Sequence, residues 1–246
     1  MKQSAETAAA LSPLLEHLPC TASAPGIPEY LETTYWWAYL HPNAVRFFER
    51  EWLVNLILWG NFRKLRDLAL LDLGEPSNQR ILQVACVYGD FTQQIVARMG
   101  AGATLDVIDV APIQLDNLRS KLPPDARVRL HHQDASDLQF PDAGFDSTLL
   151  FFLLHEQPED IRRATLAEAV RVTRPGGKII IVDYHKPKRS NPLRYLMKAV
   201  LTLLEPFARD LWRKELDSYL PANIKVGSIA KTCHFGDLYQ KVVIYR

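Results

Sequence analysis

The sequence predicts an α/β domain with a mainly parallel sheet. The chain has 246 residues, 48% of them hydrophobic, which suffices for one sizeable core and makes a second full domain unexpected. From residue 81 onward, short apolar runs typical of strands alternate with helical segments, which indicates helices on both faces of a parallel sheet. Near the end, two more strand-like runs are joined by Phe235-Gly236-Asp237, a connection short enough for an antiparallel hairpin.

The individual elements follow from these patterns. Arg174-Pro175-Gly176-Gly177 is expected to break the chain just before the fifth strand. A seven-stranded sheet of five parallel strands and a late hairpin resembles the Rossmann-like sheet of class I S-adenosylmethionine (SAM) methyltransferases. The expected strands are 81–85, 104–109, 128–132, 147–153, 178–183, 228–234 and 238–245, and the expected helices between the first five are 92–99, 111–121 and 159–172.

The first third of the chain is expected to have a different organisation. Residues 1–28 are rich in Ala, Ser and Pro and are expected to be mobile, with a short helix at 5–17. Residues 29–76 are expected to form an aromatic-rich helical extension or lid over a SAM-binding domain at 77–246. Within the extension, apolar residues recur close to every 3.6 positions over 43–73, which predicts helical structure that ends before Gly74 and Pro76.

Charge, cysteines and hydropathy restrict the setting. A net charge of +1 argues against nucleic acid as the main partner. The three cysteines show no CxxC pairing, so we expect reduced cytoplasmic thiols and neither a disulfide frame nor a zinc site. No apolar run reaches membrane-spanning length, and the N-terminal residues lack the pattern of a signal peptide.

The most informative loop follows the first strand, where a doubly wound sheet binds its ligand. Class I methyltransferases usually carry an acidic residue at the place of Gln83 and glycines at the places of Ala85, Val87 and Gly89, so only Gly89 matches. Asp109 ends the second strand, where a carboxylate can accept hydrogen bonds from both ribose hydroxyls. Asp134 follows the third strand, where such folds commonly contact the adenine. We expect the cofactor to contact Gln83, Ala85, Val87, Tyr88, Gly89, Asp109, Val110, Asp134 and Ala135.

The departures from the glycine pattern have physical meaning. Ala85 is one methyl larger than glycine and should cost little. Val87 is harder to accommodate, because a β-branched residue resists positive φ and blocks close approach of backbone to ligand. Either the backbone of the loop follows a different path from that in other class I methyltransferases, or the ligand binds in a different position, or the ability to bind the ligand has been lost.

Three segments resemble the rhodoquinone-biosynthesis family RquA, and the likeness covers roughly residues 28–246. They are Val84-Ala85-Cys86-Val87-Tyr88-Gly89-Asp90-Phe91-Thr92, Glu32-Thr33-Thr34-Tyr35-Trp36-Trp37-Ala38-Tyr39-Leu40-His41-Pro42, and Val182-Asp183-Tyr184-His185. The resemblance implies conversion of ubiquinone to rhodoquinone, in which an amino group replaces a ring methoxy group. It further implies SAM as the nitrogen donor and a divalent metal, Mn²⁺. More distantly, the core is similar to ubiquinone and menaquinone C-methyltransferases.

Gln83 suggests how such a change of reaction could arise. An acidic residue at this position would favour the ammonium form of the ligand's amino group, which has no lone pair for attack on a quinone. Neutral Gln83 removes a bias worth roughly 1–3 pKa units. We hypothesise that Gln83 and Val87 together free and redirect the amine.

Candidate catalytic groups lie at the ends of the fourth and fifth strands, which face the ligand cleft. We expect catalytic roles for His155, Glu156, Tyr184 and His185, although each could instead be a helix cap or surface residue. His155, Asp183 and His185 offer nitrogen and oxygen ligands suited to Mn²⁺.

Two segments point to a lipid substrate. Tyr35, Trp36 and Tyr39 belong to an aromatic run that cannot all face inward, so we expect it to cover the quinone or to enter a membrane surface. Residues 191–217 place an apolar stripe among basic residues, which either binds anionic lipid or packs on the sheet. The expected location is cytoplasmic and peripheral on the inner membrane.

Other functions also fit these residues. A SAM-dependent quinone C-methyltransferase is the nearest, and a non-catalytic SAM-fold scaffold of a quinone-synthesis complex is another. A nicotinamide dehydrogenase is disfavoured, because the loop lacks GxGxxG spacing.

Overall fold

A computed structural model describes residues 25–125, 127–222 and 226–246. The expected helix at 5–17 lies outside the described residues, as do all but the last four residues of the expected mobile segment 1–28.

A seven-stranded sheet forms the centre of the molecule, with the order β3-β2-β1-β4-β5-β7-β6. Strands β1 to β5 are parallel, and β7 pairs antiparallel with β5 on one side and with β6 on the other. This confirms the expected parallel sheet with a late antiparallel hairpin. The strands are β1 (Arg80–Val84), β2 (Thr104–Asp109), β3 (Val128–His132), β4 (Phe145–Phe151), β5 (Thr173–Tyr184), β6 (Ser228–His234) and β7 (Tyr239–Tyr245).

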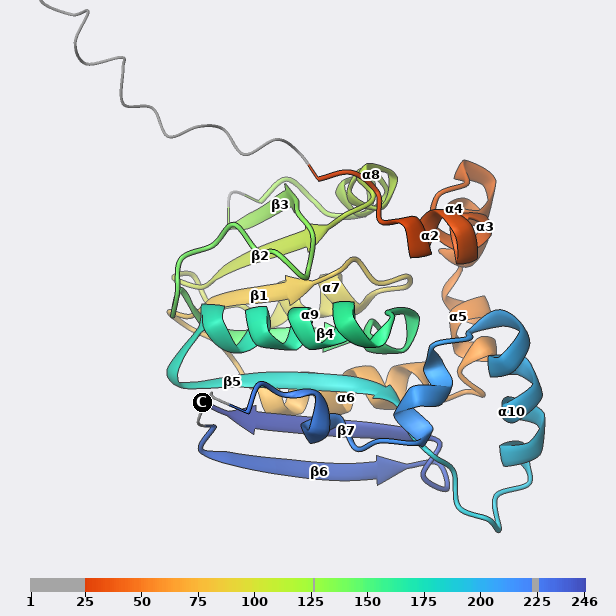
Figure 1. The fold of residues 1–246 in the computed structure, drawn as a ribbon. Coiled ribbons are helices and arrows are strands. Elements are labelled where there is room, and N and C mark those ends of the chain that lie inside the picture. Colours follow the sequence, from red (N-terminus) through yellow and green to blue (C-terminus); the bar gives the residue numbers. More distant parts are fainter. Residues whose placement is uncertain (1–24, 126, 223–225) are drawn as a thin grey trace, which may run out of the picture.

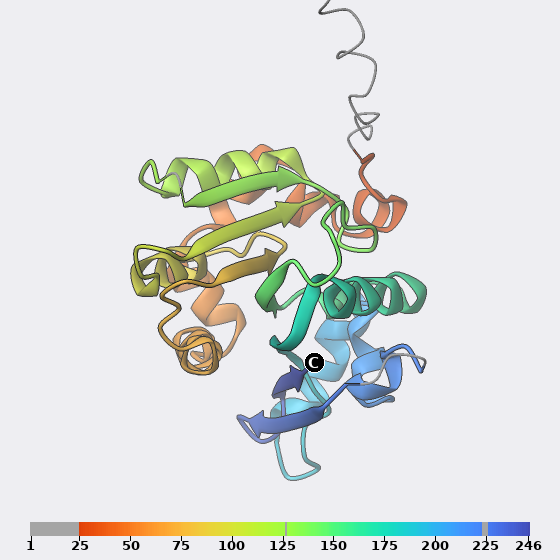
Figure 2. The same ribbon diagram turned by 90° about the vertical axis from the view of Figure 1, so that its left-hand side faces the viewer.

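Helices cover both faces of this sheet and create two apolar cores (Figures 1 and 2). Side chains alternate along each strand, so Ile81 of β1 packs into one core and Leu82 into the other. The first core lies under α6 (Phe62–Leu73), α7 (Phe91–Arg98) and α8 (Pro112–Lys121). The second lies under α9 (Glu159–Val172) and the 3-10 helix η4 (Leu216–Tyr219).

A group of helices covers the carboxyl ends of the parallel strands, at the right-hand end of Figure 1. It comes from two segments far apart in the sequence, and we call it the cap. The indole N–H of Trp59, which follows the first segment, donates to Met197 Sδ in the second at 3.2 Å. The cap consists of α2 (Glu29–Thr34), α3 (Trp36–Tyr39), α4 (Pro42–Phe48), α5 (Glu51–Ile57) and α10 (Leu193–Leu204).

Residues 43–73 are mostly helical, as expected, but the helical segment is divided into α4, α5 and α6. Arg50 is extended between α4 and α5, and Trp59 and Gly60 take positive φ of 55° and 76° before α6 begins. These breaks let the chain leave the cap and turn onto the sheet. Apolar spacing near 3.6 persists through the turns, so periodicity alone could not reveal them.

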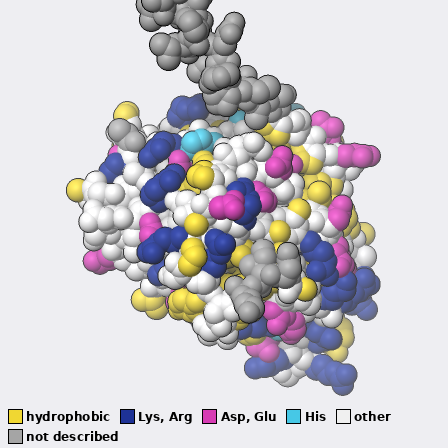
Figure 3. Space-filling model, turned by 60° about the vertical axis from the view of Figure 1, so that its left-hand side comes forward, with side chains coloured by type: hydrophobic (Ala, Val, Ile, Leu, Met, Phe, Trp, Pro, Cys, Tyr) yellow, Lys and Arg dark blue, Asp and Glu magenta, His cyan; other side chains and the backbone are white. Residues whose placement is uncertain are grey.

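The fifth strand also differs from expectation, because it begins at Thr173 and includes the Arg-Pro-Gly-Gly turn. Phe145 pairs with Thr173, whereas Ser147 pairs with Lys178, so residues 174–177 form a bulge within the strand. On the outer surface, Lys and Arg side chains are interspersed with Asp and Glu on the face shown in Figure 3.

Candidate functional site

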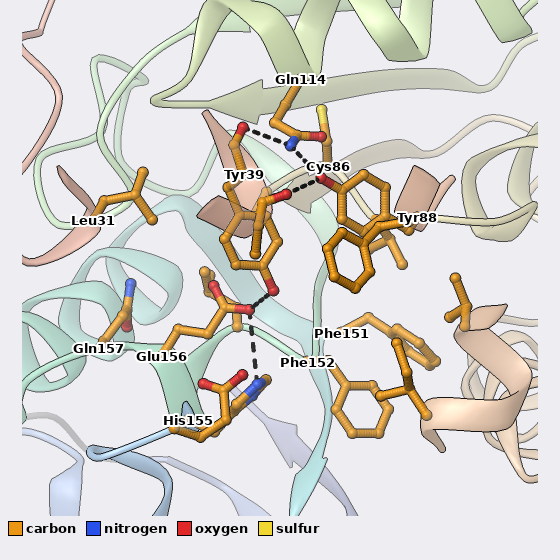
Figure 4. A pocket seen from close by; sticks show the side chains of 18 of the residues that line it. Leu31, Tyr39, Cys86, Tyr88, Gln114, Phe151, Phe152, His155, Glu156 and Gln157 are labelled. Carbon is orange, nitrogen blue, oxygen red and sulfur yellow. Dashed lines mark hydrogen bonds and ion pairs between the residues drawn. The ribbon is translucent and has the colours of Figure 1, made fainter. Parts of the chain in front are cut away.

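A cavity of about 500 Å³ lies between the cap and the carboxyl ends of the strands. Aromatic and aliphatic side chains supply most of its wall, with a few polar groups among them (Figure 4). It adjoins β1 and β4, where the strand order reverses, which is the place where ligands bind in open α/β sheets.

In the loop after β1, the strained backbone conformation lies at a different residue from the one expected. Ala85, not Val87, takes the left-handed conformation, with φ of 71°. Gly89 also has positive φ, and a Cβ there would come within 2.8 Å of the Phe62 ring. The loop therefore does follow a path that Val87 tolerates, and Val87 lines the cavity while packing against the core.

Gln83 and Gly89 are the expected cofactor contacts that do not line the cavity. Gln83 is fully buried; its Nε2 donates to the Ala85 carbonyl at 3.0 Å, and its Oε1 accepts from the Thr92 hydroxyl at 2.9 Å. The Gly89 N–H donates to Glu49 of the cap at 3.1 Å. Both residues hold the loop in place, because their polar atoms are already used within the protein.

The other expected cofactor residues meet along one wall: Ala85, Val87, Tyr88, Asp109, Val110, Asp134 and Ala135. Each Asp109 oxygen accepts a backbone N–H at 2.8 Å, one from Cys86 and one from Ala111. Burial raises the pKa of Asp109 to about 6 despite these bonds. Because a carboxylate oxygen has a second lone pair, Asp109 can still accept ribose hydroxyls.

His155 and Glu156 line the opposite wall, and Asp183, which does not line the cavity, contacts His155. His155 and Glu156 belong to the 3-10 helix η2 (Leu154–Glu156) and Asp183 to the end of β5. His155 Nδ1 lies 3.0 Å from Asp183 Oδ1, and its Nε2 lies 3.7 Å from Glu156 Oε1. The Tyr39 phenol donates to the same Glu156 oxygen, so a cap residue reaches across the cavity to this cluster (Figure 4).

Burial and mutual charge shift the titration of these groups. Burial opposes a charged imidazole, but the carboxylates of Asp183, Glu205 and Glu156 outweigh it and raise the pKa of His155 to about 9. Burial also raises the pKa of Glu156 and of Glu205 above the usual carboxyl range. The cluster therefore retains protons near neutral pH and can exchange them with a ligand.

Glu205 and Gln114 are among the polar cavity residues that the sequence analysis did not identify. Glu205 follows α10 and lines the wall near His155; its only sequence signal is an acid within an otherwise basic stretch. Gln114 of α8 donates from Nε2 to the Tyr39 carbonyl at 2.9 Å and to the Tyr88 hydroxyl at 2.8 Å. The Tyr39 and Tyr88 rings stack at 5.8 Å.

Besides Gln83 and Gly89, four expected site residues do not line the cavity: Tyr35, Trp36, His185 and Asp183. Trp36 is 53% exposed, and Tyr35 is fully buried behind the wall, because successive residues of a helix point in different directions. The His185 ring lies against the β6–β7 hairpin, with Nδ1 3.1 Å from the Asp237 carbonyl oxygen. Tyr39 and Tyr184 do line the cavity.

The expected Mn²⁺ ligands do not converge. His155 and Asp183 are neighbours, but His185 points elsewhere, and both Asp183 oxygens already accept backbone N–H groups, from Leu154 and Tyr184. Among the described residues, no three His, Cys, Asp or Glu side chains are grouped as metal ligands would be. These residues do not fit the expected metal site.

The architecture and the position of the cavity define the fold of class I SAM-dependent methyltransferases. Residues 81–177 match a family model described as a methyltransferase domain. The chain is 28% identical over 135 residues to a demethylmenaquinone methyltransferase of Staphylococcus aureus, an alignment covering 55% of each chain. The match thus spans about half of that relative's length.

Solved structures share this fold at lower identity. A SAM-dependent methyltransferase from Aquifex aeolicus superposes with a TM-score of 0.52 at 18% identity, covering 83% of this chain and 97% of that one. The [4+2]-cyclase SpnF superposes with a TM-score of 0.54 at 17% identity, covering 74% and 80%. Because a cyclase shares it, the fold does not by itself identify the reaction.

Proposed function

We propose that the protein is a SAM-dependent transferase acting on a quinone ring, and that it aminates ubiquinone to rhodoquinone. The observation that carries the proposal is that one cavity has two chemically different walls. One wall offers Asp109 and Asp134 to a nucleoside, and the other offers an apolar floor beside the proton-exchanging pair His155 and Glu156. The relatives named demethylmenaquinone methyltransferases support a quinone, and the resemblance of residues 84–92 and 32–42 supports amination.

Residues that line the cavity can assist the addition of an amine to the quinone ring. The carbon that bears methoxy is a vinylogous ester, so an amine adds there, charge develops on the carbonyl oxygen, and methoxide then leaves. Protonated His155 can donate to the oxygen or to the departing methoxide, giving methanol. Burial raises the pKa of Glu156 to about 8, so the fraction of molecules in which Glu156 is ionised grows toward that pH, and its carboxylate can then accept the proton released from nitrogen. This step forms one carbon–nitrogen bond, breaks the bond between the ring carbon and the methoxy oxygen, and releases methanol.

Gln83 contributes indirectly in this proposal. It does not touch the cavity, but its amide donates to the carbonyl of Ala85, which does. A glutamate at this position would place an acceptor against that carbonyl and a negative charge beneath the loop. We expect Gln83→Glu to slow amination at least tenfold in a protein whose circular dichroism is unchanged, and a full rate would contradict this role.

The deciding experiment is turnover of ubiquinone by purified protein with ¹⁵N-labelled SAM, with and without added Mn²⁺. Mass spectrometry of the lipid should show methoxy replaced by a labelled amino group. A gained methyl group would instead establish the C-methyltransferase, which the named relatives favour. SAM binding without turnover under every condition would establish the scaffold.

Ubiquinone is a lipid, so this function includes a peripheral membrane partner, in keeping with the expected location on an inner membrane. No helix within the described ranges is long and apolar enough to cross a bilayer.

A further inference from the structure

Large apolar side chains are exposed mainly on the cap. On α10, Leu203 is 81% exposed and Tyr195 70%; on α5, Leu56 is 63% exposed and Trp52 57%. Leu196, Leu204, Ile57 and Trp59 are exposed beside them. Surface apolar residues are ordinarily scattered singly, and a group of this kind marks a surface that meets another apolar phase.

This apolar surface continues into the cavity. Leu56, Ile57, Trp59 and Leu204 are exposed to the outside and also line the cavity wall. The contact between Trp59 and Met197 places the end of α5 beside α10, in agreement with Figure 1. A hydrophobic molecule could therefore pass between these two helices into the cavity without leaving apolar contact.

Basic side chains border the same surface. Residues 186–204 contain Lys186, Lys188, Arg189, Arg194 and Lys198 and no acidic residue. The next acid along the chain, Glu205, is buried in the cavity wall, and Lys188 alone of these five cations pairs with a carboxylate among the described residues, that of Asp237 at 3.5 Å. On the other segment, Arg46 and Arg50 flank the exposed Phe47. An apolar surface edged by cations is complementary to an anionic lipid bilayer.

We propose that α5 and α10 form a membrane-docking surface that presents the mouth of the cavity to an anionic bilayer. Trp52, Tyr195 and Leu203 enter the boundary between headgroups and acyl chains, while the basic residues hold the headgroups. The inference rests on the proposed function in taking the substrate to be a lipid quinone.

Vesicle co-sedimentation tests the docking surface without any turnover. We expect the wild-type protein to bind vesicles of phosphatidylcholine with phosphatidylglycerol several-fold better than vesicles of phosphatidylcholine alone, and high salt should remove the difference. The double variant Tyr195→Glu/Leu203→Glu should bind at least tenfold more weakly, and neither residue lines the cavity.

Leu71→Glu is the matched control. Leu71 is 74% exposed on α6, near Asp72 and Leu73, whose carbonyls accept from Lys178 at the opposite end of the sheet from the cap. The Leu71→Glu variant should bind vesicles as well as the wild-type protein does. If the wild-type protein binds neither kind of vesicle, the proposal is overturned and a protein partner is favoured. If Leu71→Glu loses as much vesicle binding as the double variant, the docking surface does not lie on α5 and α10.

Activity separates this inference from the proposed function. The double variant should process a short-tailed, water-soluble quinone like the wild type and lose turnover of ubiquinone embedded in vesicles. If the wild type binds vesicles but modifies neither quinone, the proposed function fails and docking stands. If the double variant also loses the short-tailed quinone, its defect lies in the cavity and the docking role is overturned.

Discussion

At the scale of single residues, Ala85 carries backbone strain that glycine would relieve. The left-handed conformation costs a non-glycine residue roughly 1–2 kcal/mol, and glycine returns roughly 0.5–1 kcal/mol of this as unfolded-chain entropy. Ala85→Gly should therefore raise the free energy of unfolding by about 0.5–1 kcal/mol. Val87→Gly, at a position without positive φ, should lower it by about 1 kcal/mol or more. Urea unfolding of the three proteins would test the opposite signs, and stabilisation by Val87→Gly would contradict this account.

His155 makes stability depend on pH. Its pKa in the folded protein, about 9, is above the ordinary value of 6.5, so its stabilising contribution is complete below about pH 6.5 and is lost as pH rises through 9. Between pH 6 and 9.5 the wild type should lose about 1–3 kcal/mol more than His155→Gln. Urea unfolding of both proteins at pH 6 and at pH 9.5 measures this difference. An NMR titration that finds the imidazole near its ordinary pKa would contradict it.

Residues at strand ends could be located from the sequence, whereas side-chain directions could not. Asp109, Asp134, His155 and Glu156 reach the cavity because the geometry of a parallel sheet brings those ends together. Tyr184 and His185 are adjacent, yet only the first faces the cavity, since side chains alternate along a strand.

At the scale of elements, one carboxylate fastens the cap to the ligand loop. Glu49, at the end of α4, accepts from the Gly89 N–H at 3.1 Å, from Lys121 Nζ at 2.7 Å and from Asn117 Nδ2 at 2.6 Å. Because the Glu49 and Lys121 side chains are only 20% and 14% exposed, water competes weakly for this network.

Glu49→Ala should therefore lower the free energy of unfolding by about 1–2 kcal/mol and speed amide hydrogen exchange in α3 and α4. Glu51→Ala is the matched control, since Glu51 pairs with Arg63 at a solvent-exposed site and should cost at most about 0.5 kcal/mol. Equal exchange in the two variants would show that Glu49 does not hold the cap.

Every strand except β5 could be placed to within two residues, but the helices of the cap could not be separated from one another. Strand boundaries follow from apolar runs between turn residues, a local signal. The helix breaks at Trp59 and Gly60, between α5 in the cap and α6 on the sheet, and Trp59 contacts Met197 of α10, 138 residues further along the chain. Contacts at that separation leave no periodic trace in the sequence.

At the scale of the whole molecule, a bound nucleoside should stabilise the fold. S-adenosylhomocysteine at a hundredfold excess over its dissociation constant should raise the free energy of unfolding by about 2.7 kcal/mol. Thermal unfolding with and without the ligand measures this shift. NAD at the same concentration should leave thermal unfolding unchanged. A shift with NAD and not with S-adenosylhomocysteine would instead favour a nicotinamide dehydrogenase. Asp109→Ala should abolish the response to S-adenosylhomocysteine.

The division of the cap between two distant segments has a consequence for biosynthesis. While the ribosome makes the chain, α2 to α5 emerge first and the five parallel strands follow, but Met197 and Leu201 of α10 arrive only after β5. Until then, Trp59 and the cavity floor have no cover on that side. The nascent protein thus exposes its most apolar surface late in synthesis, when a chaperone or a nearby bilayer can occupy it before α10 does.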